Sequence, residues 1–514
     1  MKLCRVFACA LLPSALLAAS AQRHASSADA AHRDLDAIGA PIRPMPADPS
    51  IQRALAQIAP AHIQHTIATL VSFHNRSTLS SMDKDLPPGS GVTAAAEWID
   101  AQFQQISAAC NGCLEVRRDT FTQTGTGPYA ARIPQPATIT SVYAILRGSD
   151  PAQSGRMLLV TGHYDSRDSS NFDTHGEAPG ANDDASGTAV SLECARVLSK
   201  VKLPATLVFV AVAGEEQGLF GSRHLAELAK QDNWQLEGVL NNDIVGGNRT
   251  PGDKFQDPHS VRVFSENVPA TASPEEIRRY LALGYDSDSP SRELARAIVD
   301  VARTYTHAPI PYSDRPIASG LEPVLEFRLD RFLRGGDHFS FNKEGFPAVR
   351  FTEWREDFNH QHQNVRVENG LQFGDLIQYD NFDYIARVAR LNGAAMASIA
   401  SAPPPPIDVK FAPVTPTHGL DNNTEIAWDA AAGAPADTHY EILWRPTAAA
   451  DWTRSILADR LASASLGKYS DAGGHYSITI PVSKDNVIFG VRAVDAKGHR
   501  SPAVVPWPAP RSPR

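Results

Sequence analysis

Several histidines and carboxylates of this 514-residue chain follow directly after short apolar segments. His163 and Asp165 come after the apolar run 157–161, and Asp183 stands just before a segment with helical periodicity. Later segments of the same kind are followed by Glu215, Glu216, Asp243, His360 and His362. If these side chains meet in a buried place, the carboxylates repel one another unless a cation lies between them. Two histidines with three carboxylates are a ligand set for two zinc ions that share one carboxylate.

The elements that must bring these residues together are short apolar strands that alternate with amphipathic helices. The sequence predicts strands at 141–146, 157–161, 205–213, 238–245 and 347–353, and mostly loop at 250–290. It predicts helices at 51–73 with a break at Pro60, and at 93–106, 187–198, 221–230, 291–305 and 381–400. Fully apolar strands between helices are typical of a mostly parallel sheet covered on both faces. We therefore predict an α/β fold with a mostly parallel mixed sheet, and its site at the carboxyl ends of the strands.

Residues 401–409 separate the α/β region from a segment of different character. They contain four consecutive prolines, which fit neither a helix nor a central strand, and we predict a stiff linker there. Beyond it, residues 410–514 carry strand patterns at 424–430, 440–446, 476–482 and 487–495, split by turn-rich loops. This spacing predicts an antiparallel β-sandwich of about a hundred residues. The segment resembles a fibronectin type III module, with Trp428 and Trp444 in its core, and we expect a stabilising or adhesive role.

The N-terminus has the three parts of a secretory signal peptide. Lys2 and Arg5 precede an apolar stretch of about a dozen residues, and small residues end it at Ala21. We predict a signal peptide at 1–21, followed by a flexible leader at 22–50 that is rich in Ala, Pro and Asp. No later segment has the run of about 18 apolar residues that spans a membrane. The mature protein is therefore expected to be secreted or periplasmic.

The overall composition is that of a globular protein. Hydrophobic residues make up 42% of the chain and charged residues 20%, which argues against disorder. The formal net charge of -9 argues against a nucleic-acid partner, because such a partner requires a basic face. The length favours two or three domains.

Three cysteines remain once the signal peptide is removed. Cys110 and Cys113 flank an Asn-Gly pair and are predicted to form a structural disulfide in an oxidising compartment. A zinc site built on them would need a second cysteine pair, which the sequence lacks. Cys194 lies in a predicted helix and is expected to be a buried free thiol.

Four motifs, in order along the chain, resemble those of a known family. They are GHYDSR from Gly162, GANDDASG from Gly180, GEEQGLFGS from Gly214 and NNDIVG from Asn241. Together they resemble the co-catalytic zinc aminopeptidases, the M28 metallopeptidases, and the resemblance spans residues 51–400, the predicted peptidase domain. The resemblance implies that His163 binds one zinc ion and that Asp183 bridges both ions. It also implies that Glu216 and Asp243 each bind one of them.

This chain departs from the family pattern at the fifth ligand. The family has a histidine in a stretch like Tyr-His-x-x-x-Asp-Thr, whereas this chain has FNHQHQN. We assign His360 as the ligand, which puts Asn364 where the family's acid stands, and His362 is the competing assignment. His338, in GGDHFSF, matches a family segment that lines the substrate pocket, and the alternative is an ordinary loop histidine.

Two further carboxylates take roles from their positions beside the ligands. Water held between two zinc ions loses much of its proton affinity, so hydroxide is available near neutral pH. Glu215 adjoins a ligand without being one, and is placed to accept that proton as general base and pass it to the leaving amine. Asp165 lies two residues after His163, on the same side of an extended chain, and is expected to orient the imidazole.

The sequence favours a secreted aminopeptidase that binds two zinc ions per chain and removes N-terminal residues from peptides. A carboxypeptidase of the same family is an alternative, because Arg328, Arg331 and Arg334 form a cluster able to grip a terminal carboxylate. A glutaminyl cyclase, which shares the fold and uses one zinc ion, is a second alternative. A non-catalytic receptor or adhesion protein on a decayed scaffold is a third, and it predicts lost ligands that this chain retains. Side-chain specificity and oligomeric state stay open.

Overall fold

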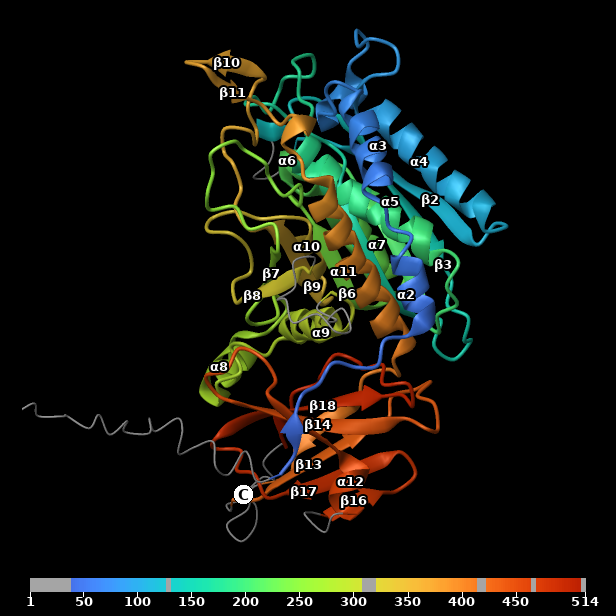
Figure 1. Cartoon of the computed structure of the whole chain (residues 1–514), viewed down its shortest axis with the longest axis vertical. Coiled ribbons are helices and arrows are strands. Elements are labelled where there is room, and N and C mark those ends of the chain that lie inside the picture. The colour runs from blue at the N-terminus through green and yellow to red at the C-terminus, as the bar shows by residue number, and fades with distance from the viewer. Residues whose placement is uncertain (1–37, 126–130, 307–319, 414–421, 464–467, 510–514) are drawn as a thin grey trace, which may run out of the picture.

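The structure is a computed structural model that describes residues 38–125, 131–306, 320–413, 422–463 and 468–509. An α/β unit and a smaller β unit lie one after the other along the long axis of the molecule (Figure 1). The predicted signal peptide at 1–21 lies outside the described residues, as does the leader up to residue 37. Within the described part of the chain, no helix is both long and apolar enough to cross a bilayer.

Eight strands form the central sheet of the α/β unit, in the order β2-β3-β5-β4-β6-β9-β7-β8. Their bounds are Leu114–Gln123 (β2), Ala137–Leu146 (β3), Arg156–His163 (β4), Thr206–Val212 (β5), Gln235–Asn242 (β6), Ser260–Ser265 (β7), Glu322–Glu326 (β8) and Ala348–Glu353 (β9). The four central strands β5, β4, β6 and β9 run parallel to one another. Antiparallel pairs occur toward both edges, between β2 and β3, β3 and β5, and β7 and β9. The predicted mostly parallel mixed sheet is confirmed.

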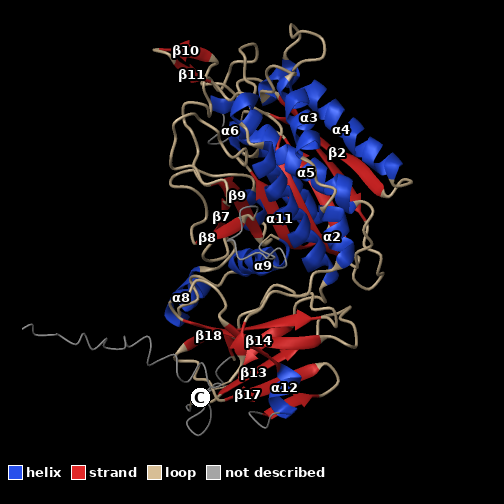
Figure 2. Cartoon of the chain, in the orientation of Figure 1, coloured by secondary structure: helices blue, strands red, loops and turns tan. Residues whose placement is uncertain are grey.

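Helices cover both faces of this sheet (Figure 2). On one face lie α2 (Pro49–Leu55), α3 (Pro60–Val71), α4 (Gly91–Ala109), α5 (Ser186–Leu198), α9 (Pro290–Tyr305) and α11 (Phe382–Ser401). On the other lie α7 (Phe220–Gln231) and α10 (His338–Lys343). Successive side chains of β4 alternate between the two layers: Leu158 and Val160 pack under α5 and α11, and Leu159 packs under α7. Both faces are therefore apolar, which explains the uninterrupted apolar runs in the sequence.

The elements that the sequence patterns did not predict are amphipathic or short. β2 is an edge strand with the sequence LEVRRDTFTQ and mostly exposed alternate positions, so it lacks an apolar run. The region 250–290, predicted to be mostly loop, contains β7 and α8 (Pro274–Leu283). Tyr280 is the only buried residue of α8, so most of that helix is exposed to solvent. The predicted helix at 51–73 is two helices, because Pro60 begins α3.

The β unit is made of two sheets. One has the order β16-β17-β13-β12-β19 and the other β1-β15-β14-β18. Their bounds are Ala40–Pro41 (β1), Ile407–Phe411 (β12), Thr424–Asp429 (β13), His439–Pro446 (β14), Arg454–Leu457 (β15), Lys468–Asp471 (β16), His475–Ile480 (β17), Val487–Val494 (β18) and Trp507–Pro508 (β19), with a short helix α12 at Ala458–Ser463. Trp428 and Trp444 are buried in the core of this unit, as predicted. All pairs are antiparallel except β12 with β19.

Two predicted connecting segments are parts of the folded structure. The prediction of a flexible leader is wrong for residues 38–50, because β1 pairs with β15 of the C-terminal unit and Asp48 caps α2. Ile38 and Met45 are buried, so burial of apolar surface holds this segment in place. The proline segment at 401–409 is packed as well: α11 extends to Ser401, β12 begins at Ile407, and most of the prolines between them are buried.

Buried ion pairs and aromatic contacts join the two units. Arg445 of β14 lies 2.6 Å from Asp288 Oδ1, just before α9, and Arg296 of α9 lies 3.0 Å from the same oxygen. These three side chains are at most 1% exposed. The ring of Tyr280 meets the edge of Trp507 at 4.8 Å between centroids. The C-terminal unit is therefore docked on the α/β unit through an ordered interface.

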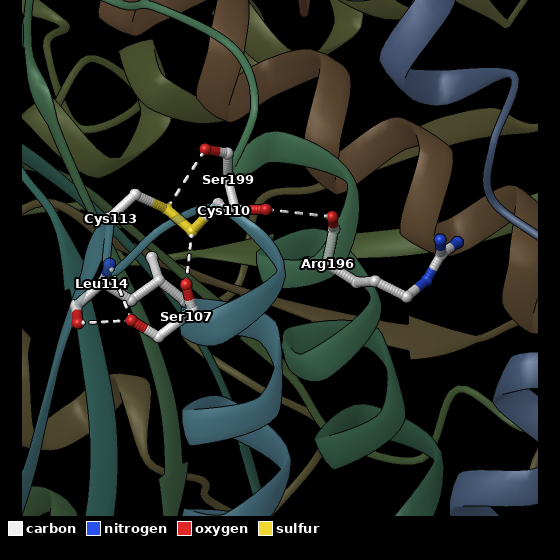
Figure 3. Close-up of a disulfide and its surroundings, with 6 residues drawn as sticks. All are labelled: Ser107, Cys110, Cys113, Leu114, Arg196 and Ser199. Carbon is white, nitrogen blue, oxygen red and sulfur yellow. Dashed lines mark hydrogen bonds between the residues drawn. A yellow bond between two sulfur atoms is a disulfide. The ribbon is translucent and has the colours of Figure 1, made fainter.

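Cys110 and Cys113 form the predicted disulfide at the turn between α4 and β2 (Figure 3). Ser107 supports the same turn, because its hydroxyl donates to Leu114 O and accepts from Leu114 N. Cys194 is a buried free thiol, as predicted, and its burial raises the pKa of the thiol.

Candidate metal centre

Five of the residues singled out in the sequence lie at the carboxyl ends of adjacent strands. His163 ends β4, Asp183 lies in the turn before α5, and Glu216 lies in α6 (Glu215–Gly218) after β5. Asp243 follows β6, and His362 lies in the loop after β9. Since β5, β4, β6 and β9 are neighbouring parallel strands, their carboxyl ends share one edge of the sheet, where such folds place their sites.

His163, Asp183 and Asp243 form the first of two groups whose donor atoms lie within 4.8 Å of one another. His163 Nε2 is 3.2 Å from Asp183 Oδ1 and 3.9 Å from Asp243 Oδ1. All three side chains are buried. Arg350 of β9 holds Asp243 from behind, with Nη2 at 2.7 Å from Asp243 Oδ1.

Asp183, Glu216 and His362 form the second group. His362 Nε2 lies 2.9 Å from Asp183 Oδ2 and 3.1 Å from Glu216 Oε1. Asp183 therefore contributes one carboxylate oxygen to each group. This is the geometry that a carboxylate shared by two cations requires.

The side chains present fit two divalent cations. Each group combines one imidazole nitrogen with carboxylate oxygens, a donor set that suits zinc, and contains no thiolate of the kind that closes structural zinc sites. His163 Nε2 is buried and has no hydrogen-bond partner among the described residues, so its lone pair is free to bind a cation. Three carboxylates so close together would also be costly to bury without positive charge between them.

Arg167 borders the second group. Arg167 Nη2 lies 2.6 Å from His362 Nδ1, and Arg167 Nε donates to Glu216 Oε2 at 2.8 Å. The guanidinium therefore contacts both His362 and Glu216 from outside the group of donor atoms.

The assignment of His360 as the fifth ligand is wrong, because the structure places His362 in the second group instead. The His360 ring stacks on Tyr379, with centroids 3.8 Å apart, and its Nδ1 faces Asp357 Oδ2 at 3.8 Å. His362 adopts left-handed backbone at φ 53°, so the loop turns between the two histidines. Sequence spacing cannot tell which of two histidines in such a loop faces inward.

The structure places His338 at the start of α10, with its side chain fully buried. Its Nε2 lies 2.9 Å from Leu329 O. Burial lowers the pKa of His338 to about 4, so the imidazole is neutral at ordinary pH. Its place in the wall of the substrate pocket stays a prediction.

Asp165 supports two parts of the site at once. His163 Nδ1 lies 3.0 Å from the backbone carbonyl of Asp165, so this nitrogen carries the ring proton and leaves the Nε2 lone pair directed at Asp183. The Asp165 carboxylate accepts the backbone N–H groups of Glu216 at 3.3 Å and Glu215 at 3.4 Å, and the hydroxyl of Thr78 at 2.8 Å. Asp165 thus fixes both the imidazole and the first turn of α6.

Glu215 lies beside the donor Glu216 but belongs to neither group. Burial raises the pKa of the Glu215 carboxyl well above its usual range, and the charges of Asp243 and Glu216 add to this. Bound cations act in the opposite direction and favour the ionised form. A carboxyl group that lies beside the donor atoms, and is not one of them, is placed to exchange a proton with a water molecule there.

Three buried residues of the site were not assigned from the sequence. Asp184 accepts the backbone N–H groups of His163 at 3.0 Å, Gly187 at 2.9 Å and Ile244 at 3.2 Å, and so ties together the ends of β4 and β6 and the start of α5. Arg350 is a charged residue in the middle of the buried strand β9, and this break in the apolar pattern is a signal that could have identified it from the sequence. Asp337 is fully buried, and burial raises the pKa of its carboxyl to about 7.

Comparison with known proteins gives the family. Residues 141–368, which include all five donor residues, match Peptidase family M28. A probable zinc metalloprotease of Pyrenophora teres f. teres is 39% identical over 496 residues, covering 96% of this chain and 94% of the relative. A second, from Leptosphaeria maculans, is 40% identical over 468 residues, covering 91% and 99%. The crystal structure of the LapA aminopeptidase of Legionella pneumophila aligns with a TM-score of 0.46 at 21% identity, over 71% of this chain and 78% of that chain. On the extent and identity of the sequence matches, this chain belongs to Peptidase family M28.

Proposed function

We propose that this protein is a secreted, zinc-dependent aminopeptidase that binds two zinc ions per chain. The observation that carries the proposal is the position of Asp183, whose two carboxylate oxygens face two separate groups of donor atoms. The names of the curated relatives, probable zinc metalloproteases, support the choice of metal and reaction class.

In this proposal His163 and Asp243 would hold one ion, Glu216 and His362 would hold the other, and Asp183 would be shared by the two groups. When bound, two zinc ions polarise the scissile carbonyl group and lower the pKa of a water molecule. Arg350 keeps Asp243 oriented through their 2.7 Å ion pair, and the carbonyl of Asp165 keeps the proton of His163 on Nδ1. The protein therefore presents donors that are already fixed before the substrate arrives.

Glu215 acts as general base and then as general acid. It accepts a proton from the attacking water and releases it to the leaving amine, which needs a carboxyl group whose protonated and ionised forms are both accessible. Its position in the first turn of α6 is set by Asp165, which holds the two successive backbone N–H groups of Glu215 and Glu216. Because the residues are adjacent, one side chain serves as a donor to the cation while the other stays free for proton transfer.

The surroundings of the donor groups favour a substrate that carries a positive charge. A small cavity next to Asp183 is lined by the carboxylates of Glu353 and Asp357, among other residues, whereas Glu356 in the same lining is already paired with arginines. Burial raises the pKa of Glu353 to about 8, so uptake of a cationic group there relieves the cost of ionising it. The free α-amine at the start of a peptide is such a group, which supports removal of N-terminal residues.

The proposal is tested by metal content and by substrate choice. We expect the purified protein to contain two zinc ions per chain by elemental analysis, and to hydrolyse leucine p-nitroanilide but not its N-acetylated form. Glu215→Gln should keep both ions and lower kcat by about 10²- to 10⁴-fold, the usual contribution of general acid–base catalysis. Glu227→Gln, at an exposed position of α7, is the matched control and should leave kcat unchanged.

Two outcomes contradict the proposal. Loss of a zinc ion in Glu215→Gln would make this residue a ligand and would overturn the division of roles between Glu215 and Glu216. Equal rates on the blocked and unblocked anilides would exclude an aminopeptidase.

Export is part of the same proposal, supported by the predicted signal peptide at 1–21 and by the Cys110–Cys113 disulfide. The mature protein recovered outside the cytoplasm should begin at or near Gln22 by N-terminal sequencing. An intact N-terminus on active protein in the cytoplasm would contradict it.

A further inference from the structure

A second, larger cavity lies beside the candidate metal centre. Its volume is about 600 Å³, a size typical of ligand sites. It is lined by Arg262 of β7 and by Arg328, Arg331 and Arg334 after β8. The phenylalanines of its lining come from these segments and, in the case of Phe358, from the loop after β9. The three later arginines are the cluster that the sequence offered as a grip for a carboxylate.

The positive charge of this cavity is only partly neutralised. Glu356 pairs with three of the arginines: its oxygens lie 3.0 Å from Arg262 and 2.8 Å from Arg331, and it also contacts Arg334. Glu326 is the other carboxylate of the lining, so four arginines face two glutamates. Among the described residues, Arg328 has no carboxylate partner. An anion that enters the cavity therefore meets an uncompensated guanidinium.

Aromatic rings fix the directions of the guanidinium groups. Arg328 lies over the ring of Phe332 at 5.7 Å, and Arg334 lies over the ring of Phe358 at 5.6 Å. These two phenylalanines are 72% and 65% exposed, which is unusual for large apolar side chains. Exposed rings beside oriented guanidiniums form a surface that suits the apolar and carboxylate parts of a peptide together.

The cavity adjoins the metal centre through shared residues. Glu356 lines both this cavity and the small cavity that contains Asp183. Arg331 also pairs with Asp330 at 3.0 Å, and Asp330 pairs with Arg350 at 3.2 Å. Arg350 in turn holds Asp243 of the first donor group. The arginine cavity and the small cavity at Asp183 therefore share Glu356 as a wall, and a chain of ion pairs links Arg331 to the first donor group.

We propose that this cavity, defined by Arg262, Arg328, Arg331 and Arg334, is a substrate subsite that binds a carboxylate of the peptide next to the scissile bond. This inference rests on the proposed peptidase function and names its substrate class: peptides with a carboxylate close to the bond that is cut. Two sources supply the same chemistry, an acidic side chain and a free C-terminal carboxylate. Each guanidinium has five N–H donors, so the pairs with Glu356 leave donors available for the ligand.

The test compares kcat/KM for matched substrates that differ by one carboxylate. The first pair, Leu-Glu-Ala amide and Leu-Gln-Ala amide, tests an acidic side chain. The second pair, Leu-Ala and Leu-Ala amide, tests a terminal carboxylate. For the pair whose carboxylate source is correct, we expect the carboxylate form to be preferred by about tenfold, as for a charge-assisted hydrogen bond.

Variants of Arg328 show whether the cavity causes that preference. Arg328→Gln should reduce the preference by about tenfold, and Arg328→Glu should reverse it. Arg328 is exposed and makes no ion pair with the described residues, so neither variant should impair folding. The matched control is Arg355→Gln, an exposed arginine after β9 that pairs with Asp253 away from the cavity, and it should keep the wild-type ratio.

The results separate failure of the subsite from failure of the enzyme assignment. The subsite is overturned if the ratio of kcat/KM values within both pairs is near one, even if every peptide is cut. It is also overturned if that ratio is the same in wild type, Arg328→Gln and Arg328→Glu. If no peptide is cut, binding is measured by calorimetry instead. The same two pairs of peptides, Leu-Glu-Ala amide with Leu-Gln-Ala amide and Leu-Ala with Leu-Ala amide, are titrated into wild type and Arg328→Gln. Tighter binding of a carboxylate form that is lost in the variant supports the subsite, and equal binding within both pairs overturns it.

Discussion

Replacement of Arg445 by methionine tests whether the C-terminal unit is an integral part of the fold. Arg445 Nη2 lies 2.6 Å from Asp288 Oδ1 at the boundary of the two units, and both side chains are 0% exposed. Methionine keeps much of the volume but removes the charge. Asp288 then retains Arg296 as its ion-pair partner and becomes a buried carboxylate with less compensation.

The size of the effect follows from these contacts. Breaking a buried ion pair by removing one partner costs about 3 kcal/mol or more. If both units unfold together, the unfolding entropy of 514 residues is about 1 kcal/mol/K, from roughly 2 cal/mol/K per residue, and Tm falls by about 3 °C. If the last hundred or so residues melted alone, their entropy of about 0.2 kcal/mol/K would turn the same cost into a fall of about 15 °C in a small separate transition.

Differential scanning calorimetry distinguishes these cases. We expect one main transition that is lowered by about 3 °C in Arg445→Met. The control is Arg366→Met, which breaks an exposed pair with Glu368 in the hairpin β10–β11 (Arg366–Glu368 and Leu371–Phe373). Exposed pairs contribute about 0 to 1 kcal/mol, so this variant should lower Tm by less than about 1 °C. Equal shifts in the two variants, or two well-separated transitions in the wild type, would refute the reasoning.

Two further predictions concern the metal donors and the pH dependence of stability. His362→Gln should lower the zinc content from two ions per chain to one, whereas His360→Gln should keep both ions. Elemental analysis measures the zinc content, and loss of zinc in His360→Gln would contradict the placement of His362 in the second group. Burial raises the pKa of Glu266 from 4.5 to about 7, so between these pH values the folded protein keeps a proton that the unfolded chain has released. The contribution of this proton to the free energy of unfolding is therefore fully present below about pH 4.5 and is lost as the pH rises toward about 7. The loss amounts to up to about 3 kcal/mol. Relative to Glu266→Gln, the wild type should lose stability over this range in urea unfolding, and parallel pH profiles would contradict the assignment.

The strands and most donor residues could be predicted because they depend on local pattern. Strands buried on both faces read as continuous apolar runs, and β4, β5, β6 and β9 were each predicted within a few residues. His163 ends β4, and Glu216 and Asp243 come soon after β5 and β6, so strand order brings these three together, whereas Asp183 lies farther along the chain in the turn before α5. Edge strand β2 and helix α8 were missed because they bury few apolar side chains, and α10 was missed because it is short.

The fifth donor and the supporting residues depend on long-range packing. His360 and His362 are equivalent in spacing, and only the course of the loop after β9, with His362 at φ 53°, turns one toward Asp183. Arg350 and Asp184 act through partners from distant segments, which no local pattern encodes.

The sequence by itself indicated the fold class through its periodicity, and its resemblance to the family motifs indicated four of the five residues that meet in the two candidate groups, because periodicity and motif spacing are properties of contiguous chain. Only the tertiary structure decided which histidine completes the second group and that residues 38–50 join the C-terminal unit. It also showed that Arg331 and Arg334, after β8, gather with Arg262 of β7 around Glu356. These features arise where segments far apart in sequence bury charge or apolar surface against one another, so their energies depend on neighbours that the local sequence does not specify.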